Sequence, residues 1–157
     1  MTIALTASAA IIRAAAPSDV AAITRCVCAA YLRHIERVGK QPWPMLQDYS
    51  SVIRTSQVHL AEREARIVGV LELLVTDEGF LLDSVAVDPS AQGTGVGRQL
   101  LEFAESEARR HGFQSIYLMT NEKMTENQAL YSRIGYVLFD RQTVHGYSRV
   151  LTRKSFM

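Results

Sequence analysis

The sequence predicts a mixed α+β fold: a mostly antiparallel sheet that contains one parallel β-α-β crossover and is flanked by about four helices. Three strand-like segments follow one another between residues 58 and 87, joined by short turns, which is typical of an antiparallel meander. Residues 79–120 then alternate as strand, glycine-rich turn, helix and strand, the pattern of a right-handed crossover between parallel strands. Two further strand-like segments close the chain.

The N-terminal part of the chain predicts a strand and a long helix. Residues 10–15 are apolar enough for a short strand. The helix starts at "PSD", with Ser18 or Asp19 as its N-cap, and apolar residues recur at helical spacing until Gly39 ends it. The next segment is expected to be a loop, because it contains two prolines and proline is excluded from helix interiors. Another short helix is expected near 46–56.

The remaining elements follow from changes in the hydrophobic period. A helix with one apolar face starts near Val96 and ends before Gly112. A shorter helix begins at "TENQ", where Thr125 and Gln128 have the spacing of a capping box, and it ends at Gly135. Strands are expected at 58–62, 66–75, 79–87 and 115–120, and in the closing segments "YVLF" and "GYSRVLTR".

Composition and charge indicate an ordinary globular chain, expected to form one domain over residues 1–157. Seventeen basic and sixteen acidic side chains give a net charge of +1, so there is no electrostatic reason to expect a nucleic-acid partner. No apolar run approaches the ~20 residues that span a bilayer. The N-terminus lacks the basic leading region of a signal peptide. We therefore expect a cytoplasmic protein without a membrane partner.

The two cysteines do not predict a metal or redox site. Cys26 and Cys28 form a C-x-C pair inside a helical pattern, which points the two thiols in different directions. This is neither a metal-ligand nor a redox spacing. Both are expected to be ordinary helix residues, and no bound metal is expected.

The stretch "AQGTGVGRQLL" places Gly93, Gly95 and Gly97 in alternate positions after a strand. A dinucleotide fingerprint started at Gly93 requires glycine or alanine where the chain has Arg98. The nucleoside-triphosphate loop requires glycine at position 92 and lysine at position 98. Both motifs are therefore excluded, and the pattern that remains is Q-x-x-G-x-G.

This pattern, in its context, resembles the GCN5-related N-acetyltransferase (GNAT) superfamily, whose signature is Arg/Gln-x-x-Gly-x-Gly/Ala. "VAVDP" precedes the loop, "GRQLLEFAE" follows it, and "NQALYSRIGY" comes about 30 residues later, in the family's order and spacing. "IIRAAAPSDVAAI" is similar to the family's first strand and helix. The resemblance covers nearly the whole chain, and it is weakest at 33–57. It implies a sheet in which two neighbouring strands splay apart.

The resemblance implies that the loop amides hold the pyrophosphate of acetyl-coenzyme A. Free N–H groups and the helix dipole favour such an anion, and glycine has no Cβ to keep it away. A tight turn that binds nothing is the alternative. The implied cofactor contacts are Val85, Ala86, Val87, Gln92, Gly93, Thr94, Gly95, Val96, Gly97, Arg98, Asn127 and Tyr131.

The implied reaction moves an acetyl group from acetyl-coenzyme A to a primary amine by direct attack. By the resemblance, the backbone of Val85, Ala86 and Val87 serves the oxyanion and the cofactor arm at a bulge, and Tyr131 protonates the departing thiolate. Asn127 lies one turn before Tyr131 on the same helix face, with Leu130 and Ile134 as the buried stripe. The alternative is that Tyr131 is a core aromatic residue.

The general base is open between several groups. Glu72 and Asp83 interrupt apolar strands, and a buried carboxylate is costly unless it is paired. Asp83 shares a strand face with Val85 and Val87 by simple alternation. Either carboxylate could equally be an outward-facing residue or an arginine partner. His34 and His59 are alternatives, and a water molecule is another.

The acceptor is a small-molecule or protein amine that the sequence does not name. Its pocket is expected in the segment 31–50, where aromatic and apolar side chains offer walls and two carboxylates could hold a cationic amine. The residues considered are Trp43, Met45, Tyr49, Glu36 and Asp48. A loop folded onto the core by its tryptophan is the alternative.

Competing hypotheses are a non-catalytic acetyl-coenzyme A sensor, a nucleotide-binding protein, and a ping-pong enzyme that uses Cys26 or Cys28. The failed motif spacings argue against nucleotide binding. Nothing near the cysteines indicates an activated thiolate. Members of the family often form dimers, and the oligomeric state of this chain stays open.

Overall fold

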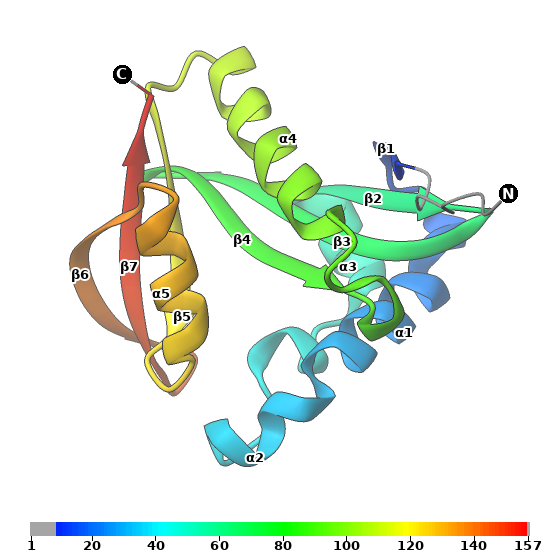
Figure 1. The fold of residues 1–157 in the computed structure, drawn as a ribbon, viewed down its shortest axis with the longest axis horizontal. Coiled ribbons are helices and arrows are strands. Elements are labelled where there is room, and N and C mark those ends of the chain that lie inside the picture. The colour runs from blue at the N-terminus through cyan, green and yellow to red at the C-terminus, as the bar shows by residue number, and fades with distance from the viewer. Residues whose placement is uncertain (1–8, 157) are drawn as a thin grey trace, which may run out of the picture.

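The computed structural model describes residues 9–156, so that the outer ends of the expected 1–157 domain lie outside the described residues. Seven strands form one sheet in the order β1-β2-β3-β4-β5-β7-β6 (Figure 1). The strands are β1 (Ile11–Ala14), β2 (Gln57–Arg63), β3 (Arg66–Thr76), β4 (Gly79–Val87), β5 (Ser115–Asn121), β6 (Val137–Val144) and β7 (Tyr147–Ser155). The helices are α1 (Val20–Tyr31), the single turn α2 (Ile35–Val38), α3 (Tyr49–Thr55), α4 (Val96–Arg110) and α5 (Thr125–Arg133).

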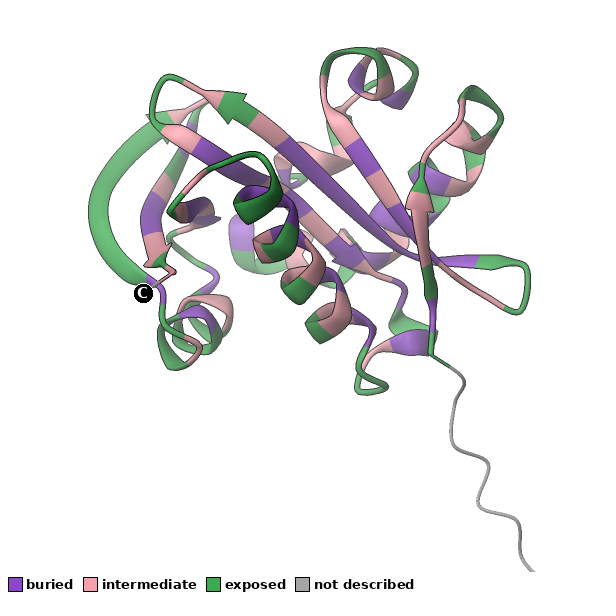
Figure 2. Ribbon diagram, turned by 90° about the horizontal axis from the view of Figure 1, so that it is seen from above, coloured by how far each residue is buried: buried purple, intermediate pink, exposed green. Residues whose placement is uncertain are grey.

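The predicted fold class is confirmed. Strands β1 to β4 form an antiparallel meander, and α4 connects β4 to β5, which pair in parallel. Strand β7 lies between β5 and β6 and pairs antiparallel with both. The order follows from burial, because β7 carries buried apolar residues whereas β6 is exposed along nearly all of its length (Figure 2).

Helices cover both faces of the sheet. Helix α4 packs on one face, where Leu71 and Leu73 of β3 meet Leu100 in a fully buried cluster. Helices α1 and α3 pack on the other face, against Val70 and Ala86. Buried strands between two helical layers give the continuous apolar runs that predicted them.

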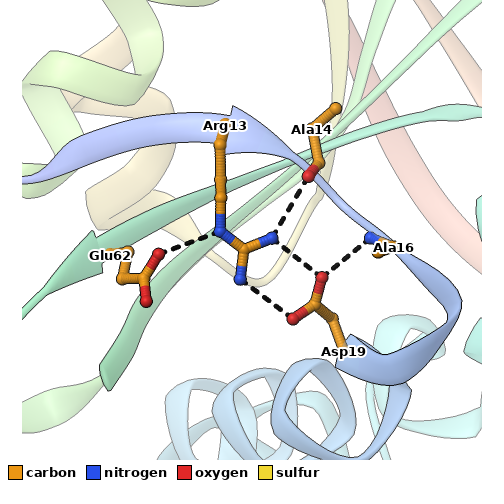
Figure 3. Close-up of polar contacts among 5 residues, drawn as sticks. All are labelled: Arg13, Ala14, Ala16, Asp19 and Glu62. Carbon is orange, nitrogen blue, oxygen red and sulfur yellow. Dashed lines mark hydrogen bonds and ion pairs between the residues drawn. The ribbon is translucent and has the colours of Figure 1, made fainter. Parts of the chain in front are cut away.

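The start of α1 differs from the predicted cap. Asp19 precedes the helix, but its side chain makes no cap bond and turns back to accept the Ala16 N–H at 2.7 Å (Figure 3). Arg13 donates to the same carboxylate from two nitrogens, both at 2.9 Å, and from its Nε to the Glu62 carboxylate of β2 at 2.9 Å. These contacts join β1, β2 and α1, and they hold the pKa of Asp19 down to about 2. Gly39, with φ of 88°, ends the helical segment as predicted, but a 3₁₀ turn at Leu32–His34 divides the expected single helix into α1 and α2.

The predicted capping box of α5 is wrong. Thr125 is the first residue inside the helix, and the buried Met124 holds the N-cap position. The Gln128 amide instead donates to the backbone carbonyls of Asn121 and Glu122, at 3.2 and 2.9 Å. The Gln128 side chain therefore joins α5 to the backbone at the end of β5 and does not cap the helix.

Candidate active site

The candidate site lies where β4 and β5 separate. These strands pair only at Leu81 with Tyr117 and at Leu82 with Leu118, and beyond this point they diverge (Figure 1). Two cavities occupy the opening. The Trp43 cavity has a volume of about 100 Å³, and the Gln92 cavity has a volume of about 660 Å³. They adjoin, because both are lined by Tyr31, His34, Val85, Asn127 and Tyr131.

The glycine loop forms one end of the Gln92 cavity. Gly93 and Gly95 have φ of 77° and 95°, a conformation that residues with a Cβ rarely adopt. The first backbone bond of α4 runs from the Gln99 N–H to the Gly95 carbonyl, which leaves the N–H groups of residues 96–98 without acceptors inside the helix. The Gln92 amide donates to the Val87 carbonyl at 3.2 Å and fastens the loop to the end of β4.

The Gln92 cavity fits a long, anionic cofactor. A Cβ built on Gly97 would meet only Val87 Cγ2, at 3.6 Å, so that glycine here is not required by the packing of the protein itself. Its missing side chain leaves the helix amides open to a ligand. Arg33, Arg98 and Lys154 also line the cavity, the last two in ion pairs with Glu102 and Glu105. These features suit a pyrophosphate at the helix N-terminus.

Tyr131 lies at the junction of the two cavities. It is 8% exposed, and its ring packs edge-on against Tyr136, with centroids 5.6 Å apart. Burial raises the pKa of its hydroxyl, which therefore keeps its proton at neutral pH. Asn127 lies one turn earlier and faces the same two cavities. A buried phenol that keeps its proton at this position can act as a general acid.

Asp83 occupies a β-bulge. In the β3–β4 ladder Glu72 pairs with Ser84 and Leu73 pairs with Leu82, which leaves Asp83 as the extra residue. The extra residue breaks the alternation, so the expectation that Asp83 shares a face with Val85 is wrong. Asp83 lies instead on the side of Glu72, whose pKa it raises, and lines the Trp43 cavity.

Glu72 lies behind Asp83 and is only 3% exposed. Burial, and next the neighbouring Asp83, raise its pKa to about 8, while Ser56 Oγ donates to it at 3.1 Å. The Glu72 carboxyl group is therefore largely protonated at neutral pH, beside Asp83 at the edge of the Trp43 cavity.

Comparison with known families identifies this arrangement. A family model described as an acetyltransferase (GNAT) domain matches residues 54–138, more than half of the chain. This chain belongs to the GNAT family. The matched range includes the bulge, the glycine loop and Tyr131 of the GNAT domain.

Individual relatives share the fold. An IAA acetyltransferase of Azospirillum brasilense is 33% identical over 79 residues, which cover 49% of this chain and 52% of that protein. The chain thus matches about half the length of that relative. The PaiA N-acetyltransferase of Thermoplasma acidophilum, in complex with coenzyme A, has a TM-score of 0.78 at 15% identity, covering 94% of this chain and 99% of its own. A GCN5-related N-acetyltransferase of Rhodopseudomonas palustris, also described as a class II aminotransferase, gives 0.78 at 20% identity, covering 97% and 99%.

The GNAT cofactor residues predicted from the sequence fall into two groups. One group lines the Gln92 cavity and comprises Val85, Ala86, Val87, Gln92, Gly97, Arg98, Asn127 and Tyr131. Gly93, Thr94, Gly95 and Val96 do not line it. Val96 is fully buried against the sheet, and the Thr94 hydroxyl donates to the Ala91 carbonyl. These residues form the turn that leads into α4.

The predicted buried stripe of α5 is wrong. Leu130 is 41% exposed, and with Ile134 it lines the Gln92 cavity of the GNAT domain. Within α5 only Tyr131 is buried. Leu130 thus belongs to a cavity wall, whereas Ile134 is partly buried and also packs against the core.

The two candidate histidines separate in space. His34 lines both cavities, and burial lowers its pKa, helped by Arg33. His59 lies on β2 against Phe103 of α4, with ring centroids 4.7 Å apart, and lines neither cavity of the site. Its burial lowers the pKa as well, but it is half-buried away from both cavities, too far to act as a base there.

The segment 31–50 of the GNAT domain, the variable segment, lines the Trp43 cavity mostly through residues other than those expected. Trp43 lines its cavity, beside Pro42, Pro44 and Gln47. The other four candidates do not line it: Glu36, Met45, Asp48 and Tyr49. Asp48 caps α3 by accepting the Ser50 N–H, and Tyr49 is buried in the core.

Sequence reasoning missed two further wall residues, Tyr147 and Arg149 of β7. Both come from a strand whose place beside β5 no local pattern reveals. Trp43 packs edge-on against Tyr147 and stacks on His145, with centroids 6.4 and 3.9 Å away. The tryptophan thus joins the variable segment to the β6–β7 hairpin.

The cysteines lie outside both cavities of the GNAT domain. Cys26 is fully buried in α1, and burial raises the pKa of its thiol to about 11, which opposes a reactive thiolate. Among residues 9–156 no cluster of three potential metal ligands is present. Within the same residues, no helix has the length and apolarity that a membrane span requires.

Proposed function

We propose that this chain is an acyl-coenzyme A-dependent N-acyltransferase that moves an acetyl group from acetyl-coenzyme A to a primary amine by direct attack. The observation that carries the proposal is the meeting of two unlike cavities at Tyr131 and Val85. One cavity ends at free helix amides suited to a pyrophosphate, and the other contains a carboxylate suited to an amine. The names of the relatives support acetyl transfer, and coenzyme A, bound to one of them, is what acetyl-coenzyme A becomes once it has given up its acetyl group.

The Gln92 cavity holds the donor in this proposal. The N–H groups at the start of α4 and the side chain of Arg98 bind the pyrophosphate, while Gln92 keeps the loop in place. Acetyl-coenzyme A, when bound, supplies a thioester whose acetyl carbon is activated for attack by an amine. The backbone at Val85, beside the bulge, lies where the acyl end of the cofactor must reach the acceptor.

The side chains at the junction move the protons. The acceptor arrives as an ammonium ion and loses two protons as the carbon–nitrogen bond forms and the carbon–sulfur bond breaks. Asp83, next to the largely protonated Glu72, accepts the first, directly or through water, and passes it to solvent. Tyr131 donates its proton to the departing thiolate. The second proton of the amine then returns to Tyr131 through the surrounding groups.

Two measurements test the proposal. The melting temperature is recorded with acetyl-coenzyme A, and with ATP and NADH as controls. At a hundredfold excess over Kd, binding adds about 2.7 kcal/mol. For a chain of this size this corresponds to a rise of roughly 5 to 11 °C. Release of the coenzyme A thiol is then followed against a panel of amines.

The expected result is a rise specific to acetyl-coenzyme A, together with amine-dependent thiol release. A rise without turnover on a broad panel would favour the acetyl-coenzyme A sensor. No rise at millimolar ligand would mean that the glycine loop keeps its turn without a cofactor, and the enzyme proposal would fall.

A further inference from the structure

Arg149 is a charged residue in the Trp43 cavity that the proposed chemistry does not use. It comes from β7, is half-buried, and lines this cavity but not the Gln92 cavity. Among residues 9–156, no hydrogen bond or ion pair joins its guanidinium to another group. The Arg149 Cζ atom lies 5.8 Å from the centroid of the Tyr147 ring. Its donors are therefore left for a ligand or water.

The setting makes this unusual for a structural arginine. Burial lowers the pKa of Arg149, and Asp83 counteracts this, so the guanidinium stays charged in a partly desolvated place. Arg98, which lines the Gln92 cavity, has an acidic partner in Glu102 at 3.1 Å, whereas no acidic side chain pairs with Arg149 among residues 9–156. A guanidinium held open in a cavity presents a planar set of donors that matches a carboxylate in two-point contact.

The Trp43 cavity thus contains two opposite charges. Asp83 lies at the bulge and suits the amine that must reach the donor cavity, and Arg149 suits an anionic group on the same acceptor. The rest of the wall is mixed, and Trp43, Leu118 and Met124 supply apolar surface to it. An acceptor that satisfies both charges carries an amine and an acid a short distance apart.

The size of the cavity favours a small molecule. Its volume is about 100 Å³. One water needs about 10–15 Å³ of such volume, so there is room for on the order of eight water-sized groups. A free amino acid with a medium apolar side chain has about that many non-hydrogen atoms, whereas the N-terminal segment of a protein is larger and presents a neutral amide in place of the carboxylate.

We propose that the acceptor is a free α-amino acid, whose amino group lies beside Asp83 at the junction and whose carboxylate binds Arg149. This rests on the N-acyltransferase function proposed above and names its substrate class. The products are an N-acetyl amino acid and coenzyme A.

The test compares acceptors that share a skeleton. Thiol release from acetyl-coenzyme A is measured with the twenty standard amino acids, and then with the amide and the decarboxylated amine of the best one; for leucine these are leucinamide and 3-methylbutylamine. We expect kcat/KM for the amino acid to exceed that of both analogues at least tenfold. Arg149→Gln should remove this preference, lowering kcat/KM for the amino acid about 10- to 100-fold through KM while changing the decarboxylated amine less than twofold.

Two variants and one binding measurement complete the design. Arg149→Lys keeps the charge but loses the planar pair of donors, so its kcat/KM for the amino acid should lie between those of wild type and Arg149→Gln. Arg141→Gln makes the same change at an exposed position of β6 and should behave as wild type. Without any coenzyme, the N-acetyl amino acid should raise the melting temperature of the wild type but not of Arg149→Gln. Binding of acetyl-coenzyme A should be equal in all variants, which verifies their folding.

The outcomes separate the two proposals. If amines without a carboxylate are acetylated as well as amino acids, or Arg149→Gln affects both classes alike, the amino-acid proposal is overturned and acetyl transfer stands. A preference for the amide would point to a protein N-terminus and also overturn it. If no amine releases thiol and acetyl-coenzyme A does not bind, both proposals fall together.

Discussion

Asp83 and Glu72 show how one extra residue changes the chemistry of a strand. Simple alternation places Asp83 with Val85, on the face that α4 covers. The bulge turns it to the side of Glu72, so the two carboxyl groups share a largely buried environment next to the Trp43 cavity. Both residues were candidates for the base, and the structure brings them together as a pair.

Replacing Glu72 with glutamine should change how stability depends on pH. The pKa of Glu72 is about 8 in the folded protein and near 4.5 in the unfolded chain. Between these values the folded state binds more protons than the unfolded state, so the free energy of unfolding falls as the pH rises. Glutamine removes this loss. The advantage of Glu72→Gln over wild type should therefore grow from about pH 5 to about pH 8.

Urea unfolding at pH 5.5, 7 and 8.5 measures this difference. Glu122→Gln, at an exposed position, serves as the matched control and should run parallel to the wild type. Parallel curves for Glu72→Gln would show that the carboxyl group is ionised throughout this range, and the carboxyl pair would be wrong.

Tyr131→Phe should lower turnover without weakening the cofactor site. The Tyr131 hydroxyl has no hydrogen-bond partner among residues 9–156, so its removal leaves the packing unchanged. If it donates the proton to the thiolate, kcat should fall by about 10²- to 10⁴-fold. The affinity for acetyl-coenzyme A should stay within about twofold, because binding does not depend on this proton. Steady-state kinetics and titration of the cofactor measure the two effects.

Tyr136→Phe is the matched control for this variant. Its ring packs against that of Tyr131, and its buried hydroxyl also lacks a partner among the described residues, but it lines neither cavity of the site. It should keep full turnover. Equal losses in the two variants would indicate disturbed packing rather than loss of a proton donor.

At the scale of elements, the position of α4 depends on a glycine in the middle of β3. A Cβ on Gly69 would lie 2.8 Å from Leu100 Cδ1 and 3.1 Å from Val96 Cγ1, both on α4. Glycine in a strand often marks such a close approach. The contact brings the first turn of α4 down onto the sheet, so that its free amides open towards the Gln92 cavity.

Gly69→Ala should therefore destabilise the protein. The added methyl group enters a filled core, and overpacking costs about 1–3 kcal/mol. In a chain of this size the melting temperature should fall by roughly 2 to 12 °C. Gly97→Ala is the matched control, because its Cβ meets only an ordinary contact at 3.6 Å. A stable Gly69→Ala would mean that α4 moves easily on the sheet.

At the scale of the whole molecule, the site depends on the order of the strands. Because β4 and β5 pair over two residues only, the sheet opens there, and α1, α5 and β7 supply the walls of the opening (Figure 1). Strand β7 joins β5 from the end of the chain and carries Arg149 into the cavity that contains Asp83. Residues from both halves of the sequence thus meet at one place.

The sequence by itself determined the elements and the cofactor loop. Strands at 66–75 and 79–87 and the helix from Val96 are found where they were expected, because each is an apolar pattern bounded by turn residues. The spacing of the loop residues excluded two nucleotide motifs, and the Q-x-x-G-x-G pattern indicated the family together with the segments before and after it. These are local properties, set by backbone preference and hydrophobic period within one segment.

Only the tertiary structure decided the acceptor side. A bulge depends on how two strands pair, so the residues of β4 alone do not reveal that Asp83 turns towards Glu72. The expected caps of α1 and α5 failed for a similar reason, because the side chains of Asp19 and Gln128 bond to groups outside their helices. The place of Arg149 follows from the insertion of β7 between β5 and β6, which is set by burial of one strand face against residues distant in sequence.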